Sequence, residues 1–176
     1  MNNNIEAIAF REAGHAVACY DLKLNIDDLS ILQTENNSGE LAHGNLLKKK
    51  FPALEDTPSD RWQMEKIIVA YLSGFASQQK FKNSENMELS QKALDQIHNF
   101  MMPFVTWEEE LIPYVDLLTV RAKKLIDDPI VWQEVQDLAS RLLKDKAISS
   151  KKARAIIRDS FIRSYDTWKK KHKEKR

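Results

Sequence analysis

Three residues near the start of the sequence have the types and spacing of an incomplete zinc site. Arg11, Glu12 and His15 occupy three positions of the helical pattern His-Glu-x-x-His, in which both imidazoles lie on one face and bind one zinc ion. The glutamate of this pattern is the general base that acts on the metal-bound water. Arg11 stands where the first histidine would be, and a guanidinium has no lone pair to donate and stays charged. The segment therefore predicts a hydrolase-type helix with a dismantled metal site, a vestigial base at Glu12 and one remaining ligand at His15.

The residues around this helix resemble one family of zinc peptidases. Ala9 and Phe10, followed by the segment Glu12–Ala16, look like the FtsH-type peptidases, whose motif is His-Glu-Ala-Gly-His-Ala after a small residue and an aromatic one. The segment Leu72–Gln78 resembles the family's Leu-Gly-Gly-Arg-Ala-Ala-Glu, which lies on a helix packed under the site. The last third of the chain is similar to the helical tail of small members that lack the ATPase module. The resemblance implies a zincin-like architecture for nearly the whole chain.

The resemblance also implies where a further ligand should lie. The family's third ligand is an aspartate four residues before an alanine, and counting back from Ala93 gives Leu89. Glu88 is the candidate for a displaced ligand. On a helix it would be rotated about 100° from the Leu89 stripe, where it could instead pair with Lys92.

Two other interactions follow from the loss of the first ligand. The charged group of Arg11 could fill the vacated space and pair with Glu85 or Glu88, whereas Glu12, as its neighbour, points in another direction. His43 could join His15 in a rewired zinc site, although a histidine on an edge strand is more often exposed. The sequence leaves these alternatives open.

Composition and charge restrict the class of protein. The chain has 176 residues, 43% hydrophobic and 30% charged, which is typical of one globular domain. A net charge of +1 argues against a general nucleic-acid footprint, and a single cysteine, Cys19, excludes an internal disulfide. We find no apolar run of membrane-spanning length, no secretory signal and no phosphate-binding loop of an ATPase module. We therefore expect a cytoplasmic domain.

The hydrophobic pattern predicts a mainly α-helical fold with a small β-hairpin. We expect helices over residues 5–20, with Asn4 as N-cap, from 57 to 76, from 89 to 101, from 107 to 126, from 129 to 144 and from 149 or 150 to 171. A strand over 29–32 should return over 40–46 after a turn. Gly14 inside the first helix indicates close packing against another element. We expect one domain over residues 1–176, composed of a motif helix with hairpin (1–50), central helices (57–102), C-terminal helices (105–165) and a basic tail (166–176).

The returning strand is the expected binding edge. In the family the matching strand lies along the cleft and pairs with extended substrate through its main chain. The residues of this edge here are Glu40, Leu41, Ala42, His43 and Gly44. The basic run 168–176 could bind an acidic partner, nucleic acid or an anionic membrane, but such a run is more often a solvated helix end.

Three functions are consistent with these residues. The ligand losses at Arg11 and Leu89, with Gln78 in place of a family glutamate, favour a pseudopeptidase that binds a protein or an extended peptide and no metal. The second possibility is an active metal-dependent hydrolase with Glu12 as base and a zinc ion held by His15 with His43 or Glu88. The third is a structural or interaction domain whose cleft has closed. Metal content separates the second from the others, and peptide binding separates the first from the third.

Overall fold

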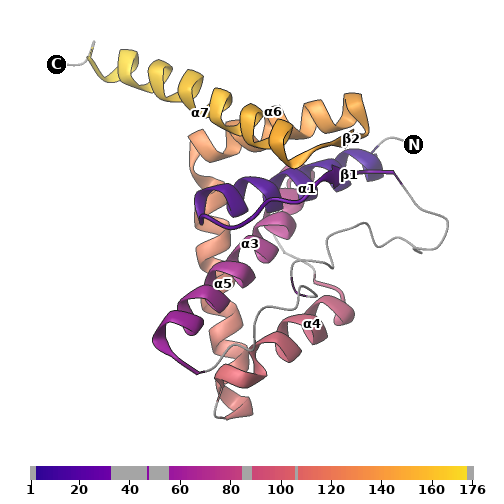
Figure 1. The fold of residues 1–176 in the computed structure, drawn as a ribbon, viewed down its shortest axis with the longest axis vertical. Coiled ribbons are helices and arrows are strands. Elements are labelled where there is room, and N and C mark those ends of the chain that lie inside the picture. The colour runs from indigo at the N-terminus through magenta and orange to yellow at the C-terminus, as the bar shows by residue number, and fades with distance from the viewer. Residues whose placement is uncertain (1–2, 33–46, 48–55, 85–88, 106, 174–176) are drawn as a thin grey trace.

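The fold is mainly α-helical with one small antiparallel sheet (Figure 1). The computed structural model describes residues 3–32, 47, 56–84, 89–105 and 107–173. Its elements in chain order are α1 (Asn3–Asp21), β1 (Leu29–Ser30), α3 (Pro58–Lys82), α4 (Gln91–Met101), the short 3₁₀ helix η2 (Met102–Phe104), α5 (Glu108–Asp127), α6 (Pro129–Asp145), β2 (Ala147–Ile148) and α7 (Ser150–Lys173). The prediction of a mainly helical chain is confirmed. None of the described helices is long and apolar enough to cross a membrane.

The helices are stacked with α1 near the middle. Helix α1 packs against α3 on one side and against α6 on the other. Helix α3 also packs against α5, and α6 packs against α7, so that α6 and α7 lie on the opposite side of α1 from α3 (Figure 1). This arrangement covers α1 on two sides, and it determines which of its polar residues are buried.

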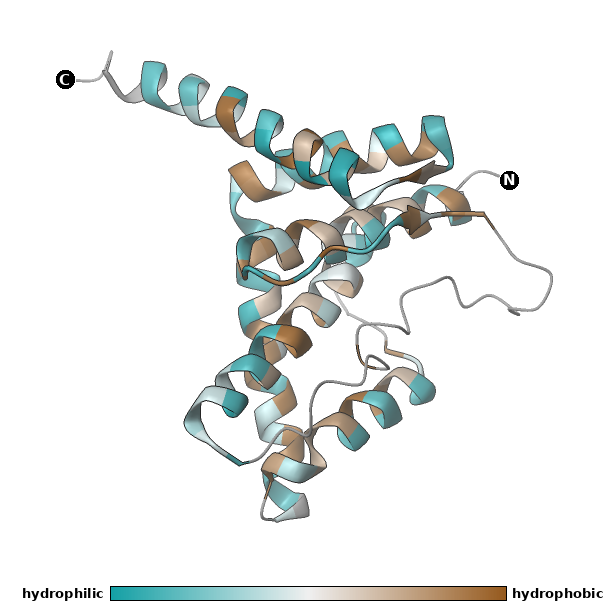
Figure 2. Cartoon of the chain, in the orientation of Figure 1, coloured by the Kyte–Doolittle hydropathy of each residue, from teal (hydrophilic) through white to brown (hydrophobic). Residues whose placement is uncertain are grey.

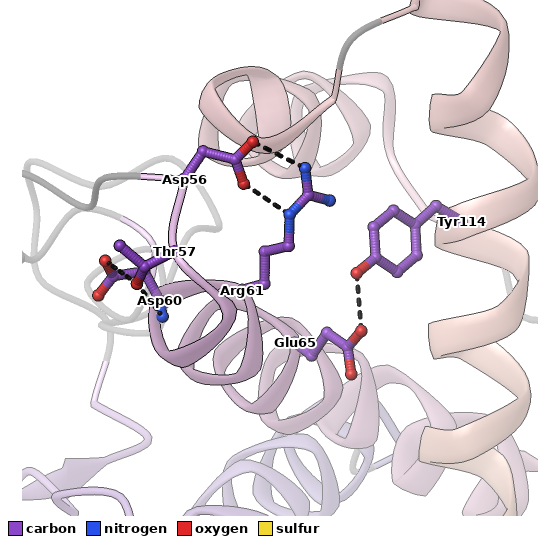
Figure 3. Close-up of polar contacts among 6 residues, drawn as sticks. All are labelled: Asp56, Thr57, Asp60, Arg61, Glu65 and Tyr114. Carbon is purple, nitrogen blue, oxygen red and sulfur yellow. Dashed lines mark hydrogen bonds and ion pairs between the residues drawn. The ribbon is translucent and has the colours of Figure 1, made fainter.

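Helix α3 is fixed at its start by short-range polar contacts (Figure 3). Thr57 caps the helix by accepting a hydrogen bond from the Asp60 backbone N–H (3.1 Å), and Pro58 follows at the first helical position. The Asp56 carboxylate pairs with the Arg61 guanidinium, with 2.9 Å between Oδ2 and Nη2. One turn later, Glu65 accepts a hydrogen bond of 2.7 Å from the Tyr114 hydroxyl, which ties α3 to α5.

Helix α3 is buried on two sides, as its continuous apolar sequence predicts. Ile67 and Ala70 belong to a hydrophobic cluster with residues of α1, α6 and α7. Ile68 and Leu72 belong to a second cluster with residues of α4 and α5. In Figure 2, by contrast, much of α7 is hydrophilic. The central position of α3 makes it the support on which α1 rests.

Strand β1 pairs with a segment far along the chain. Leu29 lies opposite Ile148 and Ser30 opposite Ala147, in antiparallel register. The predicted returning strand over 40–46 lies outside the described residues, and β1 covers two residues of the predicted four. The β2 partner was not predicted, because two residues are too few to show an alternating pattern.

Two predicted helix starts are displaced. Helix α1 already includes Asn3, so Asn4 is within the helix and is not its cap. Helix α4 starts at Gln91, with Ser90 as N-cap accepting from the Ala93 N–H (3.2 Å), so Leu89 precedes the helix. The serine cap offers a hydrogen bond that the apolar stripe does not reveal.

Candidate functional site

The motif residues lie where α1 crosses α3. Glu12 and His15 are both buried, with 3% and 4% of their surfaces exposed. The two helices cross closely at Gly14. A Cβ atom added there would stand 2.1 Å from Ser77 Oγ and 2.8 Å from the Ser73 carbonyl oxygen. The prediction of close packing at Gly14 is therefore confirmed.

The imidazole of His15 is held by the backbone of α3. Its Nδ1 lies 3.0 Å from the Ala70 carbonyl oxygen. Because a carbonyl only accepts, Nδ1 is the protonated nitrogen. A Cβ atom at Gly74 would be 2.4 Å from Nε2, so the ring packs directly on that glycine. A neutral ring in this tautomer has its lone pair on Nε2, which is the usual arrangement of a metal-ligating histidine.

Arg11 lies over the same part of α3. Its Nε is 4.0 Å from Glu12 Oε1, and its guanidinium carbon is 5.6 Å from the centre of the Phe75 ring. This separation is within ion-pair range but too long for a hydrogen bond, so it does not contradict the prediction that Arg11 hydrogen-bonds a carboxylate other than Glu12. The guanidinium thus lies between the Phe75 ring of α3 and the neighbouring Glu12 carboxylate, within reach of both. Glu85 and Glu88, the predicted partners, lie outside the described residues.

Burial changes the protonation of Glu12. Removal of the carboxylate from water raises its pKa to about 7, although the nearby His15 and Arg11 each lower it. A carboxyl group with this pKa exchanges its proton near neutral pH, which is the range in which a general base is most effective. Glu12 thus has one chemical property that the prediction of a general base requires.

The other predicted ligands are not brought to this site by the described part of the structure. Leu89 is partly buried against the second hydrophobic cluster. Glu88, His43 and the edge 40–44 lie outside the described residues, so these predictions are not tested. Within the described ranges, no group of three or more His, Cys, Asp or Glu side chains is placed to hold a metal ion.

Sequence reasoning missed a second buried acid, Glu134 of α6. It is 2% exposed, and burial together with the nearby carboxylates of Asp21, Asp128 and Asp137 raises its pKa to about 8. Its spacing of three from Val131 and four from Leu138 places it on the apolar stripe of α6, which was the available signal.

The sequence matches no model of a protein family, and no curated protein is found to match it. The likeness to FtsH-type peptidases therefore depends on the motif residues alone.

Proposed function

We propose that this chain is a pseudopeptidase: a domain similar to the FtsH-type peptidases that acts by binding a protein or an extended peptide rather than by hydrolysis. The main support is the position of Arg11, whose charged group lies 4.0 Å from Glu12 at the place of the first ligand. A fixed positive charge there repels a zinc ion. It also partly offsets the negative charge of the buried Glu12 carboxylate, which a metal ion would otherwise do.

The packing around His15 gives this residue a structural role. The His15 ring fills the space left by Gly74 and binds the Ala70 carbonyl, so it joins α1 to α3. A buried polar residue with such a role is retained after catalysis is lost, because its removal leaves a cavity and a hydrogen-bonding group without its bond.

Zinc content of the purified, untagged protein tests this proposal. We expect metal well below one equivalent in the natural protein and in Arg11→Gln, which removes the charge without adding a ligand. Arg11→His restores the first imidazole of the family's motif and should raise the zinc content above that of the natural protein. Stoichiometric zinc in the natural protein would contradict the proposal.

An active metal hydrolase is the second candidate, and the His15 tautomer favours it. The Nδ1–Ala70 bond orients the ring as outer-shell carbonyls orient the ligating histidines of metal sites. In this case Glu12 is the base and His43 or Glu88 completes the ligand set. The natural protein would then contain zinc and cleave casein, Glu12→Gln would abolish cleavage with zinc retained, and His43→Gln or Glu88→Gln would lower the zinc content.

Binding of extended peptide is tested at the predicted edge. The probe is carboxymethylated α-lactalbumin, which stays unfolded, and binding is followed by fluorescence anisotropy. Consecutive backbone N–H groups of a strand point to opposite edges. Proline has no N–H, so one of the two variants Leu41→Pro and Ala42→Pro should remove a donor on the edge that the peptide pairs with. We expect one of the two to weaken binding, with Ala42→Ser as the matched control. No binding by the natural protein would favour the third function, a structural domain with a closed cleft.

A further inference from the structure

Helix α7 presents a row of exposed aromatic rings. Phe161, Tyr165 and Trp168 follow one another at helical spacings of four and three residues, with 45%, 38% and 48% of their surfaces exposed. The rings of Phe161 and Tyr165 are 5.7 Å apart and tilted by 8°, and those of Tyr165 and Trp168 are 6.0 Å apart and tilted by 13°. We call these three residues the aromatic stripe. They form a continuous apolar strip along one side of the helix.

The same helix has a large positive net charge. Its 24 residues include nine lysines or arginines and two aspartates, a formal charge of +7, whereas the whole chain has +1. Lys169 lies beside the stripe, with Nζ 5.2 Å from the centre of the Tyr165 ring. Lys170, at five residues from Tyr165, lies about 140° away around the helix. One lysine, Lys169, therefore borders the stripe, whereas Lys170 lies on another side of the helix.

The position of α7 makes this part of the helix accessible. Its first half packs on the protein body through Ala153, Ile157 and Ser160, which are fully buried. Residues 165–170 are all exposed, and this end of the helix extends beyond α6 (Figure 1). The three rings of the stripe are therefore open to solvent on this part of the helix.

We propose that the C-terminal half of α7 binds the surface of an anionic lipid membrane, with the aromatic stripe at the boundary of headgroups and acyl chains. Interfacial helices have a basic polar face and aromatic residues on the other face. Tyrosine and tryptophan suit this depth because an apolar ring carries a polar group, and lysine keeps its charge in water while its stem lies along the apolar layer. Residues 162–173 contain five lysines or arginines and one aspartate, and this formal charge of +4 complements an anionic surface.

Other occupants fit the stripe less well. Bases of a single strand stack on open ring faces, but the Tyr165 ring already has Phe161, Trp168 and Lys169 against it. A second copy of α7 would bring another +7 charge to the same place. Neighbouring Ile162, 50% exposed, adds aliphatic surface that a bilayer accommodates and a nucleic acid does not use.

Flotation of the full chain with vesicles tests this inference. We expect binding to phosphatidylcholine vesicles that contain about 30% phosphatidylserine and little binding to phosphatidylcholine alone. Replacing the three stripe residues by serine should weaken binding roughly tenfold or more, as should Lys169→Glu with Lys170→Glu. The control for the stripe is Trp107→Ser with Ile112→Ser; Trp107 precedes α5, Ile112 lies on it, and each is 65% exposed. The control for the charge is Lys123→Glu with Lys124→Glu on α5. Both control variants should bind the vesicles like the natural protein.

Three results would overturn the inference. The first is no binding to the anionic vesicles. The second is equal binding by the natural protein and the stripe variant. The third is binding of oligothymidylate, or self-association in the ultracentrifuge, that depends on the stripe while the vesicles stay unbound. Unchanged thermal unfolding of each variant shows that a loss of vesicle binding is not a loss of folding.

Discussion

The His15 imidazole lies directly against Gly74, where a Cβ atom would stand 2.4 Å from Nε2 and 2.5 Å from two ring carbons. The reverse contact occurs one turn away, where Gly14 of α1 admits Ser77 of α3. Each helix thus provides one glycine for a larger side chain of the other. These two contacts determine how closely α1 and α3 approach, and with it the burial of Glu12.

Replacing Gly74 by alanine should destabilise the protein. Alanine favours a helix by about 1 kcal/mol over glycine, but its methyl group would overlap the fixed His15 ring, so we expect a net loss of about 1–3 kcal/mol. Urea unfolding measures the change. In the double variant with His15→Ala the loss should be smaller than the sum of the single losses, because the overlap is gone. Additive losses would show that the ring does not occupy this space.

Gly14→Ala should be the more damaging glycine substitution. The new methyl group would meet the Ser73 carbonyl oxygen as well as Ser77, and backbone cannot turn aside as a side chain can. We expect a loss of about 3 kcal/mol or more in urea unfolding. Unlike the case of Gly74, truncating the facing side chain by Ser77→Gly should recover only part of the loss. Full recovery would contradict the backbone contact.

Arg11 should stabilise the fold through both charge and ring contact. Arg11→Ala removes the cation beside buried Glu12 and the contact with Phe75, and we expect a loss of about 1–2 kcal/mol in thermal unfolding. Arg11→Lys keeps the charge but not the planar group, so it should lie between the natural protein and the alanine variant. An unchanged melting temperature in Arg11→Ala would remove the structural role proposed for this residue.

Glu134 should make stability depend on pH in a defined direction. Its pKa is raised from its ordinary value of 4.5 to about 8, so between these pH values the folded state binds more protons than the unfolded state. Stability contributed by the neutral carboxyl is therefore complete below about pH 4.5 and is lost as the pH rises through 8. Glu134→Gln stays neutral and should be more stable than the natural protein above about pH 8, by roughly 2–4 kcal/mol.

Unfolding by urea at several pH values measures this effect. The exposed Glu109→Gln of α5 is the control, and its unfolding free energy should stay within about 0.5 kcal/mol of the natural value at each pH. A Glu134→Gln profile parallel to that of the natural protein would show that Glu134 is not the group responsible.

The elements that could be predicted from sequence are those with a strong periodic or capping signal. The Thr57–Pro58 start and the continuous apolar run of α3 located that helix, and the α5, α6 and α7 bounds agree with prediction to within a few residues. The pairing of Leu29 with Ile148 could not be predicted, because no local pattern relates segments so far apart in the chain.

The site was predictable in part for the same reason. The spacing of Glu12 and His15 placed both on one helix face, and Gly14 indicated the close contact beside them. The partners of these residues come from α3, so Ala70 and Gly74 as the support of His15 required the tertiary structure. The Arg11 side chain also contacts Phe75 of α3, and the local sequence around residues 11 and 12 does not predict that contact.

The pairing of β1 with β2 affects the order in which the protein can form during synthesis. One side of α1 is covered by α6, and the β1–β2 pair joins the start of the chain to a segment just before α7. At about 5–20 residues per second, a ribosome needs roughly 6–25 s to extend the chain from β1 to β2. Helix α1, with Glu12 and His15, therefore leaves the ribosome well before α6, the second helix that covers it. Contacts of such sequence separation also slow folding.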